Sequence, residues 1–114
     1  MIKIEAVIRP QKLEDVKDHL GKSGIRALTI LEATDYKENR GDASATYRGA
    51  GVSHDSVRML LVRFFVADED VEDAVETLLG AAMTGTGRDG EISVTHVNRL
   101  VDITTGETIT RALD

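Results

Sequence analysis

The chain has 114 residues, of which 41% are hydrophobic and 30% charged, and this length suits one domain rather than two. The 20 acidic and 14 basic residues give a formal charge of −6, which disfavours nonspecific attraction to nucleic acid or anionic lipid. Cysteine is absent, so disulfides, zinc–thiolate sites and thiol nucleophiles are excluded. No apolar run suits a secretory signal or a membrane span, and we expect a cytoplasmic protein without membrane insertion.

The first third of the chain predicts a strand, a helix and a second strand. Residues 2–8 alternate between apolar and mostly charged side chains, as in a strand with one buried face. The apolar stripe of Leu13, Val16 and Leu20 then predicts a short amphipathic helix. Residues 27–33 read as the second strand, and a strand, helix and strand within about 30 residues indicate a crossover connection.

Residues 35–56 change in character, because they contain glycines, small polar residues and almost no large aliphatic side chains. Connections of this length are uncommon inside a compact domain, and they are usually binding loops or disordered segments. We therefore predict a long loop with a binding role. The alternative is a surface loop without a function.

The segment 57–66 is apolar at both odd and even positions, which is typical of a strand covered on both faces. One layer of helices covers only one face of a small sheet. We therefore expect another subunit to cover the second face.

The last third of the chain predicts a helix, a strand and a hairpin. Asp68 is placed to cap a helix with an apolar stripe over residues 71–79. A strand over 91–97 follows, and residues 100–110 form a hairpin around a Thr-Gly turn. The complete order predicts one α+β domain over residues 1–114, with the split βαβ arrangement of ferredoxin-like folds, βαββαβ.

The glycine-rich segment 85–90 matches the spacing G-x-G-x-x-G, but it follows a helix and precedes a strand. This order is the reverse of the dinucleotide-binding fingerprint, so a Rossmann interpretation is rejected. A glycine-rich turn can instead present backbone N–H groups to an anion, and Thr84, Thr86 and Arg88 add hydroxyl and guanidinium donors. The segment is either a turn that binds phosphate or carboxylate, or a plain connection.

Neither a metal site nor a catalytic group is evident from the sequence. His19, His54 and His96 lie far apart and show no ligand spacing with carboxylates, and His96 is expected to be a histidine that is hydrogen-bonded or partly buried. No nucleophile is accompanied by a base, so we expect no enzymatic activity. The alternative is a small ferredoxin-like enzyme that uses Asp89, Glu91 or His96 as acid or base.

Several separated motifs occur in an order that is characteristic of one known family. They are Ile4-Glu5-Ala6-Val7-Ile8-Arg9-Pro10 with Lys12-Leu13-Glu14-Asp15-Val16, Tyr47-Arg48-Gly49-Ala50, Thr84-Gly85 with Asp89-Gly90, and Thr105-Gly106-Glu107. Together they resemble the PII signal-transduction protein family, the nitrogen regulatory P-II proteins, nearly from end to end.

The resemblance implies a ferredoxin-like homotrimer in which residues 35–56 correspond to the family's T-loop. In that family the T-loop contacts a target such as a membrane transporter or an enzyme, and the segment 47–50 would be its partner-binding part. The resemblance also implies that an adenine nucleotide binds in clefts between subunits and shifts the loop between conformations. The positions that match this cleft, together with nearby donors for an anion, are Thr29, Lys37, Asn39, Arg40, Thr84, Gly85, Thr86, Gly87, Arg88, Asp89 and Gly90.

At several charged positions this chain departs from the pattern that it resembles. Asp102 and Thr104 replace two arginines that engage phosphates in the family, and Glu91 replaces a lysine. Asn39 replaces the glutamine that helps to chelate magnesium with 2-oxoglutarate in the family. Val52 occupies the place of the tyrosine that is nucleotidylated in some members, so modification there is not expected.

These departures favour an effector with less negative charge than ATP. Each lost charge-assisted contact to phosphate forfeits about 1.5–3 kcal/mol, so AMP, ADP, a cyclic nucleotide or bicarbonate would tolerate them better. We expect a divergent PII-like regulator of a transporter or enzyme that requires no cofactor, and the resemblance suggests bicarbonate transport as a context. The alternatives are a nitrogen-regulatory PII protein that binds ATP and 2-oxoglutarate, and a structural adaptor that binds no effector.

Overall fold

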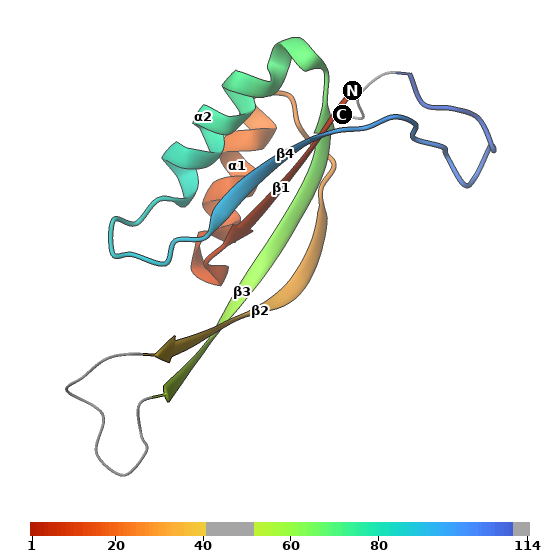
Figure 1. Cartoon of the computed structure of the whole chain (residues 1–114). Helices are drawn as coiled ribbons and strands as arrows, with labels where there is room; N and C mark the ends of the chain where they lie inside the picture. The colour runs from red at the N-terminus through yellow and green to blue at the C-terminus, as the bar shows by residue number, and fades with distance from the viewer. Residues whose placement is uncertain (41–51, 111–114) are drawn as a thin grey trace.

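A computed structural model describes residues 1–40 and 52–110, without the side chains of residues 39, 40 and 52–54 (Figure 1). Its strands and helices follow in the order β1 (Ile2–Ile8), α1 (Leu13–Lys22), β2 (Thr29–Arg40), β3 (Val52–Val66), α2 (Val71–Ala82) and β4 (Glu91–His96). This order confirms the predicted βαββαβ arrangement. Among the described residues, no helix is both long and apolar enough to cross a bilayer.

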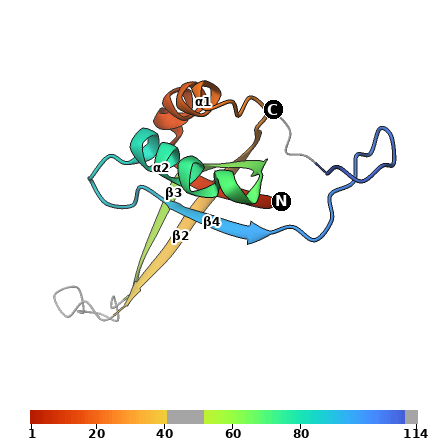
Figure 2. The same cartoon turned by 90° about the horizontal axis from the view of Figure 1, so that it is seen from above.

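The strands form one antiparallel sheet in the order β2-β3-β1-β4. Each helix therefore connects two strands that are separated by a third, as in the predicted split βαβ units. Both helices lie on the same face of the sheet, as the view from above shows (Figure 2). The fold consequently has two layers, with one face of the sheet free of helices.

The hydrophobic core lies between the helices and the sheet. Val16 and Leu20 of the predicted helical stripe are fully buried, and Leu78 of α2 is buried beside them in the same cluster. The sheet contributes its even-numbered apolar positions, because alternate residues of a strand share a face. These are Ile4, Ala6 and Ile8 of β1 and Val62, Phe64 and Val66 of β3.

The helix-free face carries a second apolar row. In the sheet register, Leu61 of β3 pairs with Val7 of β1 on one side and with Leu31 of β2 on the other. Val7 and Leu61 are partly buried, and 49% of Leu31 is exposed. Within the described residues, the face that was expected to meet another subunit is therefore only partly covered.

The predicted loop over residues 35–56 includes residues at both ends that belong to strands. Residues 35–40 and 52–56 belong to β2 and β3, which pair continuously from Thr29↔Arg63 to Arg40↔Val52. This extension carries no pattern in the sequence, because a ribbon that projects from the sheet buries no face and needs no apolar alternation. Residues 41–51, including the predicted partner-binding motif Tyr47-Arg48-Gly49-Ala50, lie outside the described residues.

Asp68 does not cap α2 as predicted. A single 3-10 turn over Asp68–Asp70 precedes the helix, so Asp70 occupies the N-cap position and makes no side-chain cap. The Oδ1 atom of Asp68 instead accepts a hydrogen bond from the α-ammonium group of Met1 at 3.0 Å. The intervening turn thus moves Asp68 two residues away from the position that a capping side chain needs.

The predicted C-terminal hairpin is confirmed in a reduced form. Val101 and Thr108 make one isolated antiparallel bridge, and the N–H group of Asp102 donates to the carbonyl of Glu107 at 2.9 Å. The predicted partial burial of His96 is wrong for the described chain, where its side chain is exposed at the end of β4. The parity of β4 did not reveal this, because the strand lies at the edge of the sheet.

Candidate functional site

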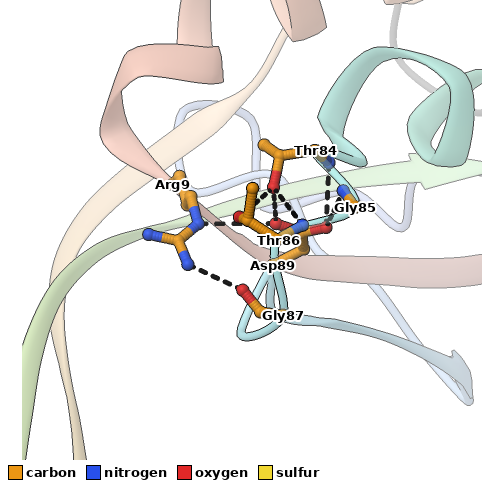
Figure 3. Close-up of polar contacts among 6 residues, drawn as sticks. All are labelled: Arg9, Thr84, Gly85, Thr86, Gly87 and Asp89. Carbon is orange, nitrogen blue, oxygen red and sulfur yellow. Dashed lines mark hydrogen bonds and ion pairs between the residues drawn. The ribbon is translucent and has the colours of Figure 1, made fainter.

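The glycine-rich turn over residues 84–90 connects α2 to β4 and brings seven predicted ligand-binding positions together. Arg9, which follows β1, reaches this turn from the far end of the sequence (Figure 3). The turn therefore lies where the carboxyl end of β1 meets the beginning of β4, whose register pairs Val7 with Glu91.

The carboxylate of Asp89 holds the first half of the turn together. It accepts hydrogen bonds from the N–H groups of Thr84 at 2.8 Å and Gly85 at 3.0 Å, from the Thr84 hydroxyl, and from Nε of Arg9 at 3.4 Å. The hydrogen bond from the Thr84 hydroxyl, followed by that from the Thr84 N–H group, lowers the pKa of Asp89 to about 2. Because this folded-state pKa lies below the unfolded value of 3.8, the contribution of Asp89 to stability is present above pH 3.8 and is lost as the pH falls through about 2.

These contacts correct the predicted anion cradle. The N–H groups of Thr84 and Gly85 already donate to Asp89, and that of Thr86 donates to Oγ1 of Thr84 at 3.2 Å. By contrast, the N–H groups of Gly87 and Arg88 make no hydrogen bond to another residue in the described part of the chain. Only the second half of the turn thus has backbone donors to offer an external anion.

Arg9 was not among the predicted site residues. Its Nη2 atom donates to the carbonyl of Gly87 at 2.7 Å, while its Nε faces Asp89. This bridge fixes the second half of the turn against the end of β1. The only sequence signal for it was the position of Arg9 within the N-terminal motif, because the residues that it contacts lie about 80 positions further along the chain.

Arg88 joins the turn to β3 through an ion pair with Asp55. Arg88 has a φ angle of +53° and is the one residue other than glycine with positive φ in the described part of the chain. This left-handed conformation is uncommon for a residue with a side chain. Asp55 was not among the predicted site residues, and no motif in the sequence marks it.

Gly90 ends the turn at a position that accepts no side chain. Its φ angle is +104°, and a Cβ atom there would lie 1.7 Å from the carbonyl oxygen of Val7 and 2.7 Å from its carbon. Gly87 also has a positive φ angle, +82°, but a Cβ atom there would meet nothing within 4 Å. Close backbone approach therefore constrains Gly90 in addition to its φ angle.

The remaining predicted residues are distributed along β2. Oγ1 of Thr29 accepts a hydrogen bond from Nη2 of Arg63 at 3.3 Å on the helix-free face. Lys37 is exposed and pairs in the register with Asp55 of β3. Asn39 and Arg40 complete β2, and their side chains lie outside the described part of the structure.

Of the three positions where the family's positive charge is missing, two are exposed and Asp102 is partly buried. Glu91 is exposed at the start of β4, and Thr104 is exposed in the C-terminal hairpin. The Oδ1 atom of Asp102 accepts a hydrogen bond from the N–H group of Thr104 at 2.8 Å. No cluster of histidine, aspartate and glutamate suited to a metal ion occurs among the residues that the structure describes.

Replacing Thr84 with valine is expected to raise the pKa of Asp89 from about 2 towards 3.8, because the hydroxyl donor makes the largest contribution to the shift. The carboxyl carbon resonance of Asp89, followed by NMR as a function of pH, measures this change. Thr86→Val is the matched control, since its hydroxyl contacts Thr84 rather than Asp89. Equal pKa values in wild type and Thr84→Val would contradict the assigned role of the hydroxyl.

Comparison with known proteins places these features in context. The family model described as "Nitrogen regulatory protein P-II" matches residues 1–107. The nitrogen regulatory protein P-II of Rhizobium meliloti (strain 1021) is 39% identical over 108 residues, with coverage of 95% of this chain and 96% of the relative. That of Azospirillum brasilense is 40% identical over 107 residues, with coverage of 94% and 95%. The structure of B. subtilis GlnK superposes with a TM-score of 0.79 at 29% identity, and the match covers 94% of this chain and 93% of that one.

Proposed function

The chain belongs to the nitrogen regulatory protein P-II family, and on this basis we propose that it senses an effector with less negative charge than ATP. ADP or AMP is the first candidate, and a small anion such as bicarbonate is the second. The effector would bind in clefts between subunits, at the glycine-rich turn. Its binding would control a transporter or an enzyme through the segment between β2 and β3.

One observation supports this choice of effector above the others. Both arginines at the turn are paired with carboxylates of the same chain, Arg9 with Asp89 and Arg88 with Asp55. The exposed carboxylate of Glu91 follows directly in sequence. A triphosphate needs several positive charges, and here each arginine must first give up a carboxylate partner before it can bind a phosphate. An effector with fewer charges needs fewer such exchanges.

We propose a homotrimer as the working form, since P-II family proteins are homotrimers that act on target proteins. The apolar row formed by Val7, Leu31 and Leu61 supports this proposal, because it leaves apolar surface on the helix-free face. Packing this row against other subunits would cover the second face of β3, as its apolar sequence pattern requires.

A second candidate function follows from the names of the relatives. The proteins with 35–40% identity to this chain are called nitrogen regulatory proteins P-II, which favours a role in nitrogen regulation with ATP and 2-oxoglutarate as effectors. The loss of positive charge at Glu91, Asp102 and Thr104, relative to the family's basic residues, argues against tight binding of a triphosphate. The two candidates therefore differ in the effector that they predict.

Calorimetric titration of the purified protein separates them. The protein is titrated with ATP, ADP, AMP and cyclic AMP, each with and without bicarbonate, and with ATP plus magnesium and 2-oxoglutarate in a separate series. We expect ADP or AMP to bind at least about tenfold more tightly than ATP, which is the effect of one lost charge-assisted phosphate contact. Tight binding of magnesium-ATP that 2-oxoglutarate strengthens would support the nitrogen-regulatory alternative. Absence of binding in every series would contradict both and favour an adaptor.

A further inference from the structure

The ion pair between Arg88 and Asp55 connects two segments that have separate roles in the proposed function. Arg88 belongs to the glycine-rich turn, where the effector would bind, and Asp55 belongs to the part of β3 that extends beyond β1. β1 pairs only with residues 60–66 of β3, so within the sheet residues 52–59 pair with β2 alone. Asp55 thus lies within a two-stranded ribbon, and Arg88 anchors this ribbon to the body of the domain.

Arg88 is also the cation best placed to serve an anion at the turn. Its own N–H group and that of Gly87 are among the turn amides that make no hydrogen bond to a described residue. Its side chain is 31% exposed, so an ion from solvent can reach it. A guanidinium group can bind a phosphate or carboxylate through paired N–H donors, and Nη1 of Arg88 donates to the carboxylate of Asp55.

We propose that Asp55 and Arg88 form a charge latch, in which the carboxylate of Asp55 occupies the guanidinium that the anionic group of the effector takes over on binding. This inference rests on the proposed function, because it assigns the effector to the glycine-rich turn. Displacement of Asp55 frees the ribbon from the turn, so occupancy of the site and the position of the ribbon are coupled. Lys37 lies directly across from Asp55 in the register and offers the released carboxylate a second cation.

The strength of the pair suits such an exchange. The Asp55 side chain is 47% exposed, and partly exposed ion pairs stabilise a protein weakly because water and salt screen them. A phosphate carries more charge than a carboxylate and can bind Arg88 and free backbone N–H groups together. The exchange of one anion for the other therefore costs little and favours the effector.

The test uses ADP and four variants of the full chain. Asp55→Asn removes the competing charge with little change in shape, Arg88→Gln removes the guanidinium, and the double variant combines them. Glu32→Gln is the matched control, because Glu32 pairs with Arg58 at 3.1 Å across the same two strands without reaching the turn. Calorimetry gives the affinity for ADP, and hydrogen exchange follows the amides of residues 35–40 and 52–57, with those of β1 reporting on the core.

We expect Asp55→Asn to strengthen ADP binding about two- to fivefold and to accelerate exchange in the ribbon by a similar factor. Arg88→Gln should weaken ADP binding about tenfold or more, and Asp55→Asn should give no gain in its presence. Glu32→Gln should leave the affinity for ADP unchanged. A merely structural ion pair would predict weaker binding in both single variants.

Two results would overturn the latch. If wild type binds ADP and Asp55→Asn binds it equally or less well, the latch is wrong while the proposed function stands. If the ribbon amides of both single variants exchange hydrogen at the wild-type rate, the latch is also wrong, whatever the affinities for ADP are. If no variant binds ADP while AMP or bicarbonate also fails to bind, the proposed function itself fails, and with it the coupling.

Discussion

Gly90→Ala is expected to destabilise the chain by about 3 kcal/mol, because two penalties add at this position. The left-handed conformation costs a residue with a side chain about 1–2 kcal/mol, and forcing extra atoms into a packed region costs about 1–3 kcal/mol. The clash is with the backbone of Val7. Because β1 is paired on both sides, this backbone cannot shift without disturbing the sheet. Urea denaturation followed by circular dichroism, at equal protein concentrations, measures the difference.

Gly87→Ala separates the two penalties. Gly87 shares the positive φ angle and the same turn, but a Cβ atom there meets open space. We expect this variant to lose about 1–2 kcal/mol, from the backbone conformation alone. Equal losses in the two variants would show that the approach of Val7 to Gly90 does not constrain the turn.

Leu61→Asp is expected to convert the proposed trimer into monomers at micromolar concentration. Leu61 lies at the centre of the apolar row on the helix-free face, between Val7 and Leu31. A carboxylate there would lose its hydration when subunits pack, at a cost of several kcal/mol for each ion, whereas in the monomer it would face water. Size-exclusion chromatography with light scattering measures the mass, and circular dichroism confirms that the strands and helices persist.

Leu79→Asp is the control for this experiment. Leu79 lies in α2 on the other side of the sheet, and 43% of its surface is exposed in the chain. The same change of residue at this place should leave the mass unchanged. A Leu61→Asp variant with the mass of the wild type would contradict the assignment of the helix-free face as the subunit interface.

The sequence predicted the parts of the fold that rely on burial. Val16 and Leu20 repeat with helical spacing, and both are fully buried on the face of α1 that packs on the core. The alternation in residues 2–8 likewise predicted β1, because one of its faces packs on the core and the other does not. Burial imposes a period on the sequence, and a period can be read without knowledge of the three-dimensional arrangement.

The ribbon and the contacts of the site could not be predicted in the same way. Residues 35–40 and 52–56 pair through backbone hydrogen bonds, which place little demand on the side chains. No pattern of apolar and polar residues therefore predicts these parts of the strands. Asp89 was correctly assigned to the turn. The hydrogen bonds that its carboxylate accepts from the N–H groups of Thr84 and Gly85, however, depend on the local backbone conformation. Arg9 and Asp55 reach the turn across about 80 and 33 positions of sequence, and such contacts exist only once the sheet has formed.

The part of β2 and β3 that extends beyond β1 has a mechanical consequence. Residues 52–59 of β3, paired only with β2, extend about 26 Å at the usual rise of about 3.3 Å per residue. Counted from Leu60, the last residue of β3 that pairs with β1, Asp55 lies five and Val52 eight residues along this arm. If the two strands turn together as one rigid unit about the edge of the sheet, a displacement at Asp55 is about 1.6 times larger at Val52. A shift of about 1 Å at Asp55 therefore becomes a displacement of about 1.6 Å at Val52, and the stiffness of the paired strands determines how much of this displacement is transmitted.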